Sequence, residues 1–97
     1  VPVLDGARDL LAAGMVAGGT TRNHAFVSAE APVDWGDLPE TEQLVLADAQ
    51  TSGGLLIAVD AGQADALVAE LVARHTPAAA VVARAVDGPA GAITVRG

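Results

Sequence analysis

Two glycine-rich polar segments carry the side chains of this 97-residue chain that could do chemistry: Gly18-Gly19-Thr20-Thr21-Arg22-Asn23 and Asp48-Ala49-Gln50-Thr51-Ser52-Gly53-Gly54. In the first segment, paired glycines allow backbone N–H groups to approach an anion closely. A threonine hydroxyl and the Arg22 guanidinium add donors that suit phosphate or carboxylate. The segment is not a Walker loop, because the lysine is missing and the spacing differs. It indicates either an anion contact or a turn in which Arg22 and Asn23 hold a long loop in place.

The second segment lies between a predicted helix and an apolar run, where backbone amides can line a ligand cleft. The alternative is a tight connection in which glycine avoids a Cβ clash and Thr51 and Ser52 satisfy local backbone groups. Ser52 is a poor nucleophile candidate, because the G-x-S-x-G elbow and a neighbouring base are absent. The candidates for lining a substrate or phosphate cleft are Gly18, Gly19, Thr20, Arg22, Asn23, Gln50, Thr51, Ser52, Gly53 and Gly54.

We assign no catalytic or metal-binding residue. The chain has no cysteine, which excludes a thiolate site and a disulfide scaffold. His24 and His75 each lack a partner at metal-ligand spacing, so surface or helix-end positions suit them better. The scattered carboxylates are more typical of a solvated face and helix capping than of a Mg²⁺ site.

The charge of the chain disfavours two classes of partner. Five arginines and no lysine stand against twelve acidic residues, for a net charge of −7. Nucleic acids and anionic membranes both need a concentrated basic surface, so we expect neither as a partner. No apolar run approaches the roughly 20 residues that a bilayer requires. We therefore expect a soluble cytoplasmic protein, with residues 1–97 forming a single domain.

Local patterns predict the elements of the first half. Apolar residues at helical spacing predict a short helix within residues 1–14, with Gly14 as its stop. Residues 15–36 show no sustained period and contain Pro32 and several glycines, which predicts a long loop. A capping box at Asp37, Pro39 and Glu40 predicts a helix through residue 47.

The second half has the pattern of a β-α-β-β unit. The run 55–59 predicts a buried strand, and residues 61–75 predict a helix capped by Asp60. Residues 79–86 and 92–95 predict two further strands that form an antiparallel hairpin. The fold class is therefore predicted to be α+β, a mixed β-sheet with helices packed on one face.

Two motifs resemble one protein family. LADAQTSGGLLIAV at residues 46–59 is similar to the LxDPQTSGGLLIAV signature of the selenophosphate synthetases, also called selenide, water dikinases. Residues 13–23 resemble that family's AAGxVPGGTxRN segment, and Val33-Asp34-Trp35 resembles the stretch between the two. Ala49 stands where the family usually has proline, a change that is compatible with the same turn. Thiamine-phosphate kinases and hydrogenase-maturation relatives are a weaker match, because the TSGGLL stretch disfavours them.

The resemblance implies a function for a larger protein. The family uses ATP and Mg²⁺ with selenide and water to make selenophosphate, and it releases AMP and phosphate. Its members have two α/β domains of the aminoimidazole ribonucleotide synthetase-like superfamily. This chain matches only the later part of the C-terminal domain.

The parts of the family that perform the chemistry have no counterpart here. The family's N-terminal cysteine or selenocysteine, its catalytic lysine and most of its metal-binding aspartates are missing. We therefore expect no cofactor in this fragment and no dikinase activity from it alone. The alternative is a free-standing, non-catalytic binding or interaction module derived from the family. In either case we expect partners that cover an open sheet edge, through self-association or through the missing N-terminal domain.

Overall fold

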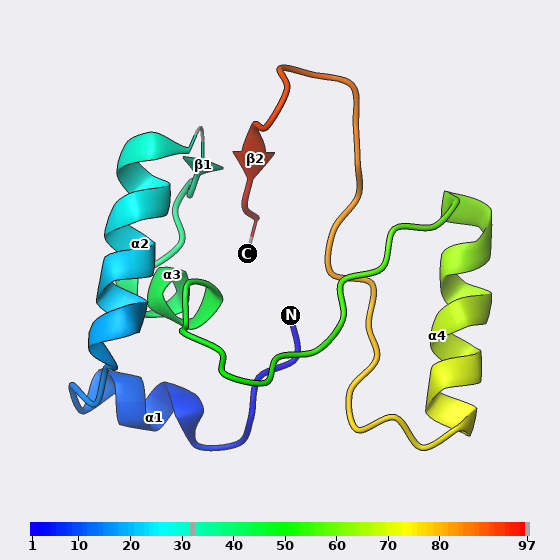
Figure 1. Cartoon of the computed structure of the whole chain (residues 1–97), viewed down its shortest axis with the longest axis horizontal. Coiled ribbons are helices and arrows are strands. Elements are labelled where there is room, and N and C mark those ends of the chain that lie inside the picture. Colours follow the sequence, from blue (N-terminus) through cyan, green and yellow to red (C-terminus); the bar gives the residue numbers. More distant parts are fainter. Residues whose placement is uncertain (32, 97) are drawn as a thin grey trace. The chain divides into compact units, whose positions relative to one another are not determined.

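The computed structural model describes residues 1–31 and 33–96, and it combines helices with a short sheet (Figure 1), as predicted for an α+β chain. Its contacts divide the chain into two units. The α1–α3 unit contains Val3–Thr51 and the C-terminal segment from Asp87. The α4 unit contains Val1–Pro2 and Ser52–Val86. The single domain expected over residues 1–97 stays a prediction.

The first helix, α1, spans Ala7–Ala12, so the predicted helix is confirmed in a shorter form. It ends as expected at Gly14, whose φ of +81° belongs to the left-handed region that favours glycine. The N–H groups of Gly14 and Met15 bond to the carbonyl groups of Leu11 and Leu10, which satisfies the end of the helix.

The loop predicted over residues 15–36 is wrong, because Gly18–Glu30 form a 13-residue helix, α2. Pro32, also placed in that loop, lies outside the described residues. No apolar stripe marks α2, and its first residues are glycine and threonine, which have modest helix propensity. The helix is stabilised by packing that the local sequence does not reveal, since its Thr20 is fully buried.

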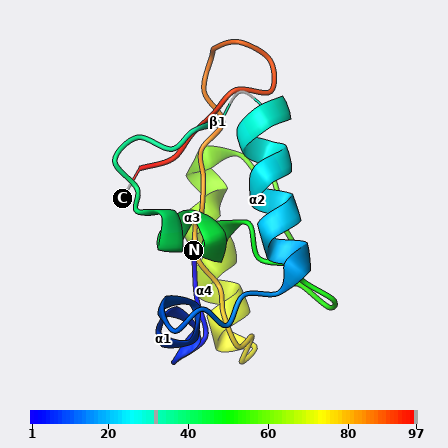
Figure 2. The same cartoon turned by 90° about the vertical axis from the view of Figure 1, so that its left-hand side faces the viewer.

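The third helix, α3, spans Glu40–Leu46 and packs against both α1 and α2 (Figure 2). Its predicted position is confirmed, but the predicted capping box is not formed. No side chain caps its N-terminus; instead the carbonyl of Pro39 accepts the N–H groups of Glu42 and Gln43. The Arg8 side chain joins α1 to α3 through Glu42.

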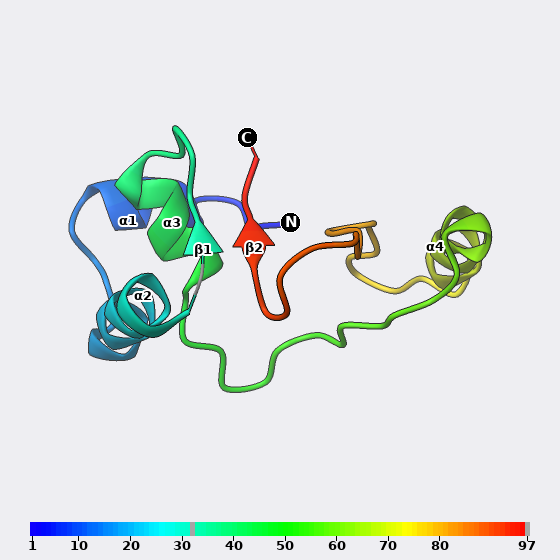
Figure 3. The same ribbon diagram turned by 90° about the horizontal axis from the view of Figure 1, so that it is seen from above.

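The described sheet has two strands, β1 (Val33–Asp34) and β2 (Ile93–Thr94), which lie side by side and pair in parallel (Figure 3). The predicted position of the last strand is confirmed, but its predicted antiparallel hairpin with residues 79–86 is wrong. Its partner is a segment about 60 residues earlier, and the N–H of Val95 extends the pairing to the carbonyl of Asp34 at 2.8 Å. Nothing in the local pattern specifies a pairing between segments so distant.

In the α4 unit, the predicted helix over residues 61–75 is confirmed. A 3₁₀ turn at Ala61–Gln63 leads into helix α4, Ala64–Ala73. Glu70 and Arg74, four residues apart, form an ion pair at the end of this helix, with Arg74 Nε 2.6 Å from Glu70 Oε1. The side chain of Asp60 makes no capping hydrogen bond.

The apolar runs 55–59 and 79–86 form no strand in the described chain, so the predicted β-α-β-β unit and mixed sheet are wrong for this structure. Within the described residues, no backbone–backbone hydrogen bond involves 51–59 or 77–88. Leu55 and Leu56 are 91% and 85% exposed. An apolar run becomes a strand only when a neighbouring strand satisfies its N–H and C=O groups.

Candidate functional site

Thr20 lies at the centre of the candidate site, and it is the one fully buried residue in the described part of the chain. Its hydroxyl donates to Asp48 Oδ1 at 2.5 Å and accepts the N–H of Ala49 at 3.2 Å. These bonds join the first turn of α2 to the segment after α3. The structure therefore brings together the two sequence segments singled out above, with Thr20 bonded to Asp48 and Ala49.

Two further contacts reinforce this junction. Asn23 Nδ2 donates to the carbonyl of Ala47 at 3.1 Å. The second carboxylate oxygen of Asp48, Oδ2, accepts a hydrogen bond from Gln50 Nε2 at 3.1 Å. Both oxygens of Asp48 are therefore engaged within the protein. The sequence analysis included Asp48 in the second segment but did not predict this linking role.

The two glycines at the start of α2 are in different surroundings. A Cβ on Gly19 would lie 2.9 Å from the Cβ of Ala49, which is closer than real Cβ contacts come. At Gly18 the nearest atom to such a Cβ is Arg22 Nη1 at 3.5 Å, an ordinary contact at the end of a flexible side chain. Gly19 is therefore required by close packing of the two segments, whereas Gly18 is not.

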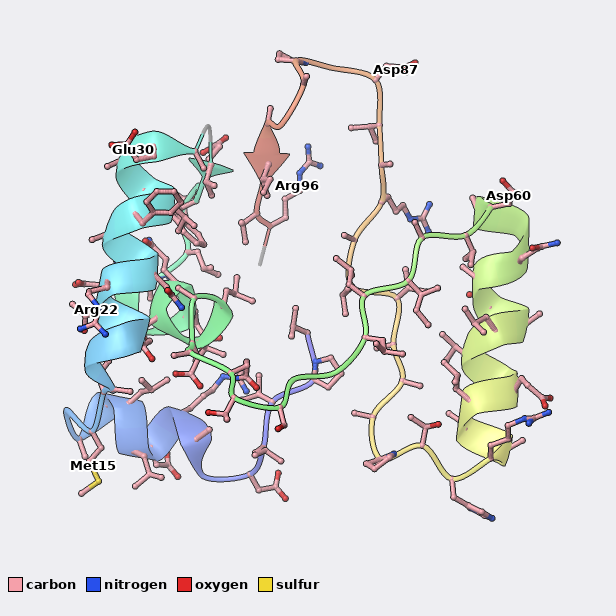
Figure 4. All side chains as sticks on the ribbon, viewed as in Figure 1. Met15, Arg22, Glu30, Asp60, Asp87 and Arg96 are labelled. Atoms are coloured by element: carbon pink, nitrogen blue, oxygen red, sulfur yellow. The ribbon has the colours of Figure 1, made fainter. Side chains whose placement is uncertain are left out.

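Arg22 lies on the same helix as Thr20 and forms no ion pair within the described residues. The ion pairs within the described residues are Arg8–Glu42 and Glu70–Arg74, and Arg22 is exposed. In the view of Figure 4 it extends from α2 on the side away from α3. An exposed arginine next to a glycine-rich helix start keeps its donors available to an anion.

The ten candidates do not all belong to one unit. Three of them, Ser52, Gly53 and Gly54, lie in the α4 unit. The other seven lie in the α1–α3 unit: Gly18, Gly19, Thr20, Arg22, Asn23, Gln50 and Thr51. The three residues in the α4 unit are all exposed.

A hollow of about 430 Å³ adjoins the junction. Polar groups enter its wall from Asn23 and Asp48, and the rest of the wall is mainly apolar. The apolar residues are Phe26, Val27, Val33, Trp35, Leu46, Ala47, Ile93 and Val95. Sequence reasoning missed this hollow, because it placed Phe26 in a loop and did not pair the two strands that contribute to the wall.

Trp35 and His24 hold the chain after α2 in place. Trp35 Nε1 donates to Ser28 Oγ at 3.2 Å, and its ring centroid lies 5.7 Å from that of His24. Trp35 therefore anchors its loop to α2. Gln43 donates through Nε2 to the carbonyl of Leu38, so its Oε1 accepts from His24 Nε2, 2.8 Å away. This network assigns the proton of His24 to Nε2.

Charge also joins helices in this unit. Arg8 donates to both carboxylate oxygens of Glu42, at 2.6 and 3.0 Å. The hydrogen bond from Arg8, assisted by its charge, lowers the pKa of the Glu42 carboxyl below its ordinary value.

The described residues contain no group of three side chains that could hold a metal ion. None of the described helices has the length and apolar character to cross a membrane.

The chain thus presents an α+β scaffold in which a glycine-rich helix start and a second polar segment meet at a buried hydroxyl. No protein-family model matches the chain, and no solved structure matches it. Curated proteins do match it, and relatives named selenide, water dikinase are among them. That of Porphyromonas gingivalis is 46% identical over 89 residues, which cover 90% of this chain and 24% of the relative. Those of Shewanella sp. and Cronobacter sakazakii are 45% and 43% identical over 75 residues, covering 77% of this chain and 20% of each relative.

The chain belongs to the selenide, water dikinase family, as the motifs at residues 13–23 and 46–59 predict. It spans between a fifth and a quarter of the length of the curated relatives that it matches.

Proposed function

We propose that this chain is the later part of the C-terminal domain of a selenide, water dikinase, within the aminoimidazole ribonucleotide synthetase-like superfamily. The parent enzyme would convert ATP, selenide and water into selenophosphate, phosphate and AMP. The observation that carries the proposal is the 46% identity with such an enzyme over nine-tenths of this chain.

Within the parent, we propose that two segments of the α1–α3 unit line one side of the cleft for the phosphates of ATP. Their lining residues are Gly18, Gly19, Thr20, Arg22, Asn23, Gln50 and Thr51. Three features of the site support this role: the two segments meet at Thr20, Arg22 has an exposed guanidinium, and Asn23 and Gln50 bring polar side chains to the junction. Arg22 would bind a phosphate by charge-assisted hydrogen bonds. Phosphoryl transfer depends on such positioning and on neutralising the charge that develops on the phosphates.

The described residues do not fit a Mg²⁺ site. Both oxygens of Asp48 already accept hydrogen bonds, and no cluster of three ligating side chains lies among the described residues. We therefore place the Mg²⁺ ligands, like the reactive cysteine and lysine, on the remaining polypeptide of the parent. This chain would supply only one side of the cleft, and we expect it to be inactive alone.

The exposed apolar runs 55–59 and 79–86 support a place inside a larger protein. Leu55, Leu56 and Val86 are each at least 85% exposed, and backbone groups along both runs have no backbone partner within the described residues. We propose that the parent's own polypeptide covers them, since at least three-quarters of each matched relative lies outside the aligned segment.

A chimera tests the proposed function. In the chimera, the corresponding residues of this chain replace the 89-residue segment of the Porphyromonas gingivalis enzyme that they match. The assay measures the AMP released from ATP in the presence of selenide. We expect the chimera to release AMP and form selenophosphate, detectable by ³¹P NMR. A chimera that folds, as shown by circular dichroism, but releases no AMP above a selenide-free control contradicts the proposal. It would favour the free-standing module.

A further inference from the structure

We infer that Thr20 is a positioning residue of the proposed cleft: it holds the backbone of Ala49 directly and the side chain of Gln50 through Asp48, and it makes no contact with substrate itself. The inference rests on the proposed function and gives Thr20 a role different from that of the other cleft candidates.

The hydrogen bonds of Thr20 are directed into the protein. Its hydroxyl donates its one hydrogen to Asp48 and accepts from the N–H of Ala49, and the residue is 0% exposed. A hydroxyl has one donor and two acceptor sites. The donor is already used and no solvent reaches the residue, so Thr20 is not placed to bind a phosphate.

Asp48 transmits the position of Thr20 to Gln50. One carboxylate oxygen of Asp48 accepts from Thr20, and the other accepts from Gln50 Nε2. If the hydroxyl is removed, Asp48 Oδ1 and the N–H of Ala49 both lose their partner. Both groups face the buried Thr20 side chain, although Asp48 and Ala49 are themselves exposed residues. A polar group that loses its partner is costly unless water replaces it, so the segment is expected to rearrange to rehydrate the two groups. The orientation of the Gln50 amide would then change, although Gln50 itself is unaltered.

Neighbouring contacts show that this arrangement couples two segments. Gly19 packs against Ala49, and Asn23 donates to Ala47, so consecutive parts of α2 contact consecutive residues after α3. Through these contacts Thr20 sets the register of the second segment, and with it the placement of the Gln50 amide donors. Such preorganised donors need no reorganisation when the substrate binds.

The variants T20V, T20S and T21V test this inference. T20V keeps the shape of Thr20 but removes the hydroxyl, and T20S restores it. T21V is the matched control, because the adjacent Thr21 is exposed in the same helix. Amide hydrogen exchange in the 97-residue chain reports the contact directly. The Ala49 amide should exchange about tenfold faster in T20V and at the parent rate in T20S and T21V.

The same variants in the chimera test the positioning role. We expect T20V and Q50A each to reduce kcat/KM for ATP about tenfold, and the double variant to lose little more than either alone. T20S and T21V should keep the parent value. If Ala49 exchange in T20V equals that of the parent, the contact itself is refuted. An active chimera whose T20V variant keeps its kcat/KM, or in which the losses from T20V and Q50A simply add, refutes the positioning role alone. A parent chimera without activity instead refutes the proposed function, and the positioning role with it.

Discussion

Arg8 in α1 and Glu42 in α3 form a bidentate ion pair, with Arg8 Nε 2.6 Å from Glu42 Oε1 and Arg8 Nη2 3.0 Å from Glu42 Oε2. The two residues are 34 positions apart, and their geometry matches the planar fork of arginine to the two oxygens of one carboxylate. The pair fastens the first helix to the helix that leads into the second glycine-rich segment.

This pair predicts a pH dependence of stability. The hydrogen bond from Arg8 lowers the pKa of Glu42 in the folded chain below its ordinary value of 4.5. A lowered carboxyl pKa stabilises the fold above the unfolded value, and this contribution is lost as pH falls through the folded pKa. We expect E42Q to lower the urea midpoint slightly at pH 7 and to match the parent chain well below pH 4. A difference that persists in acid would contradict the assignment, and added salt should reduce the difference at pH 7.

The two glycines of α2 predict opposite effects of the same substitution. G19A should lower the free energy of unfolding by about 1–3 kcal/mol, because the new Cβ would meet the Cβ of Ala49 at 2.9 Å. G18A is the matched control and should be neutral or stabilising by about 0.5 kcal/mol, because alanine favours the helix and the new Cβ would meet only Arg22 Nη1, at an ordinary 3.5 Å. Urea unfolding followed by far-ultraviolet circular dichroism measures both. Equal effects of the two variants would refute the close approach.

The exposed apolar run 55–59 predicts self-association of the isolated chain, because the polypeptide proposed to cover it is absent. Light scattering at increasing protein concentration should show species larger than the monomer. L56D should shift the chain towards monomer by placing a charge in the run. L4D is the control, since Leu4 and Leu56 are 86% and 85% exposed but lie in different parts of the sequence. A parent chain that stays monomeric at high concentration would contradict this prediction.

The isolated chain is predicted to release no AMP. It contains no cysteine or lysine, and its carboxylate Asp48 is already engaged on both oxygens. Incubation with ATP, Mg²⁺ and selenide, followed by chromatography of the nucleotides, should leave ATP unchanged beyond the protein-free blank. An amount of AMP that rises in proportion to the concentration of the chain would show that the reactive groups lie within these 97 residues.

Arg22 is predicted to contribute to ATP binding in the chimera. R22A should raise KM for ATP about tenfold, because a charge-assisted hydrogen bond to phosphate is lost. R74A is the control, since Arg74 is exposed but already pairs with Glu70 on α4. The ratio of the two KM values is the measurement. If R22A and R74A leave KM equally unchanged, Arg22 does not bind the phosphates.

The amino-acid sequence by itself determined features that depend on near neighbours. The helix at α4 follows from apolar residues at helical spacing, and the pair of Glu70 and Arg74 follows from positions four apart on one helix face. Gly14 ends α1 because few other residues adopt its backbone conformation. The motif at residues 46–59 was sufficient to identify the family, although it did not reveal which of its side chains are buried.

Only the tertiary structure decided the features that depend on distant contacts. The helix α2 has no apolar stripe, and its first turn is held by Asp48, 28 residues away from Thr20. The pairing of β1 with β2 joins segments about 60 residues apart, whereas the strongly apolar run 55–59 has no strand neighbour among the described residues. A hydrogen-bond partner or a buried surface is a property of two segments at once. The composition of one segment alone therefore does not specify it.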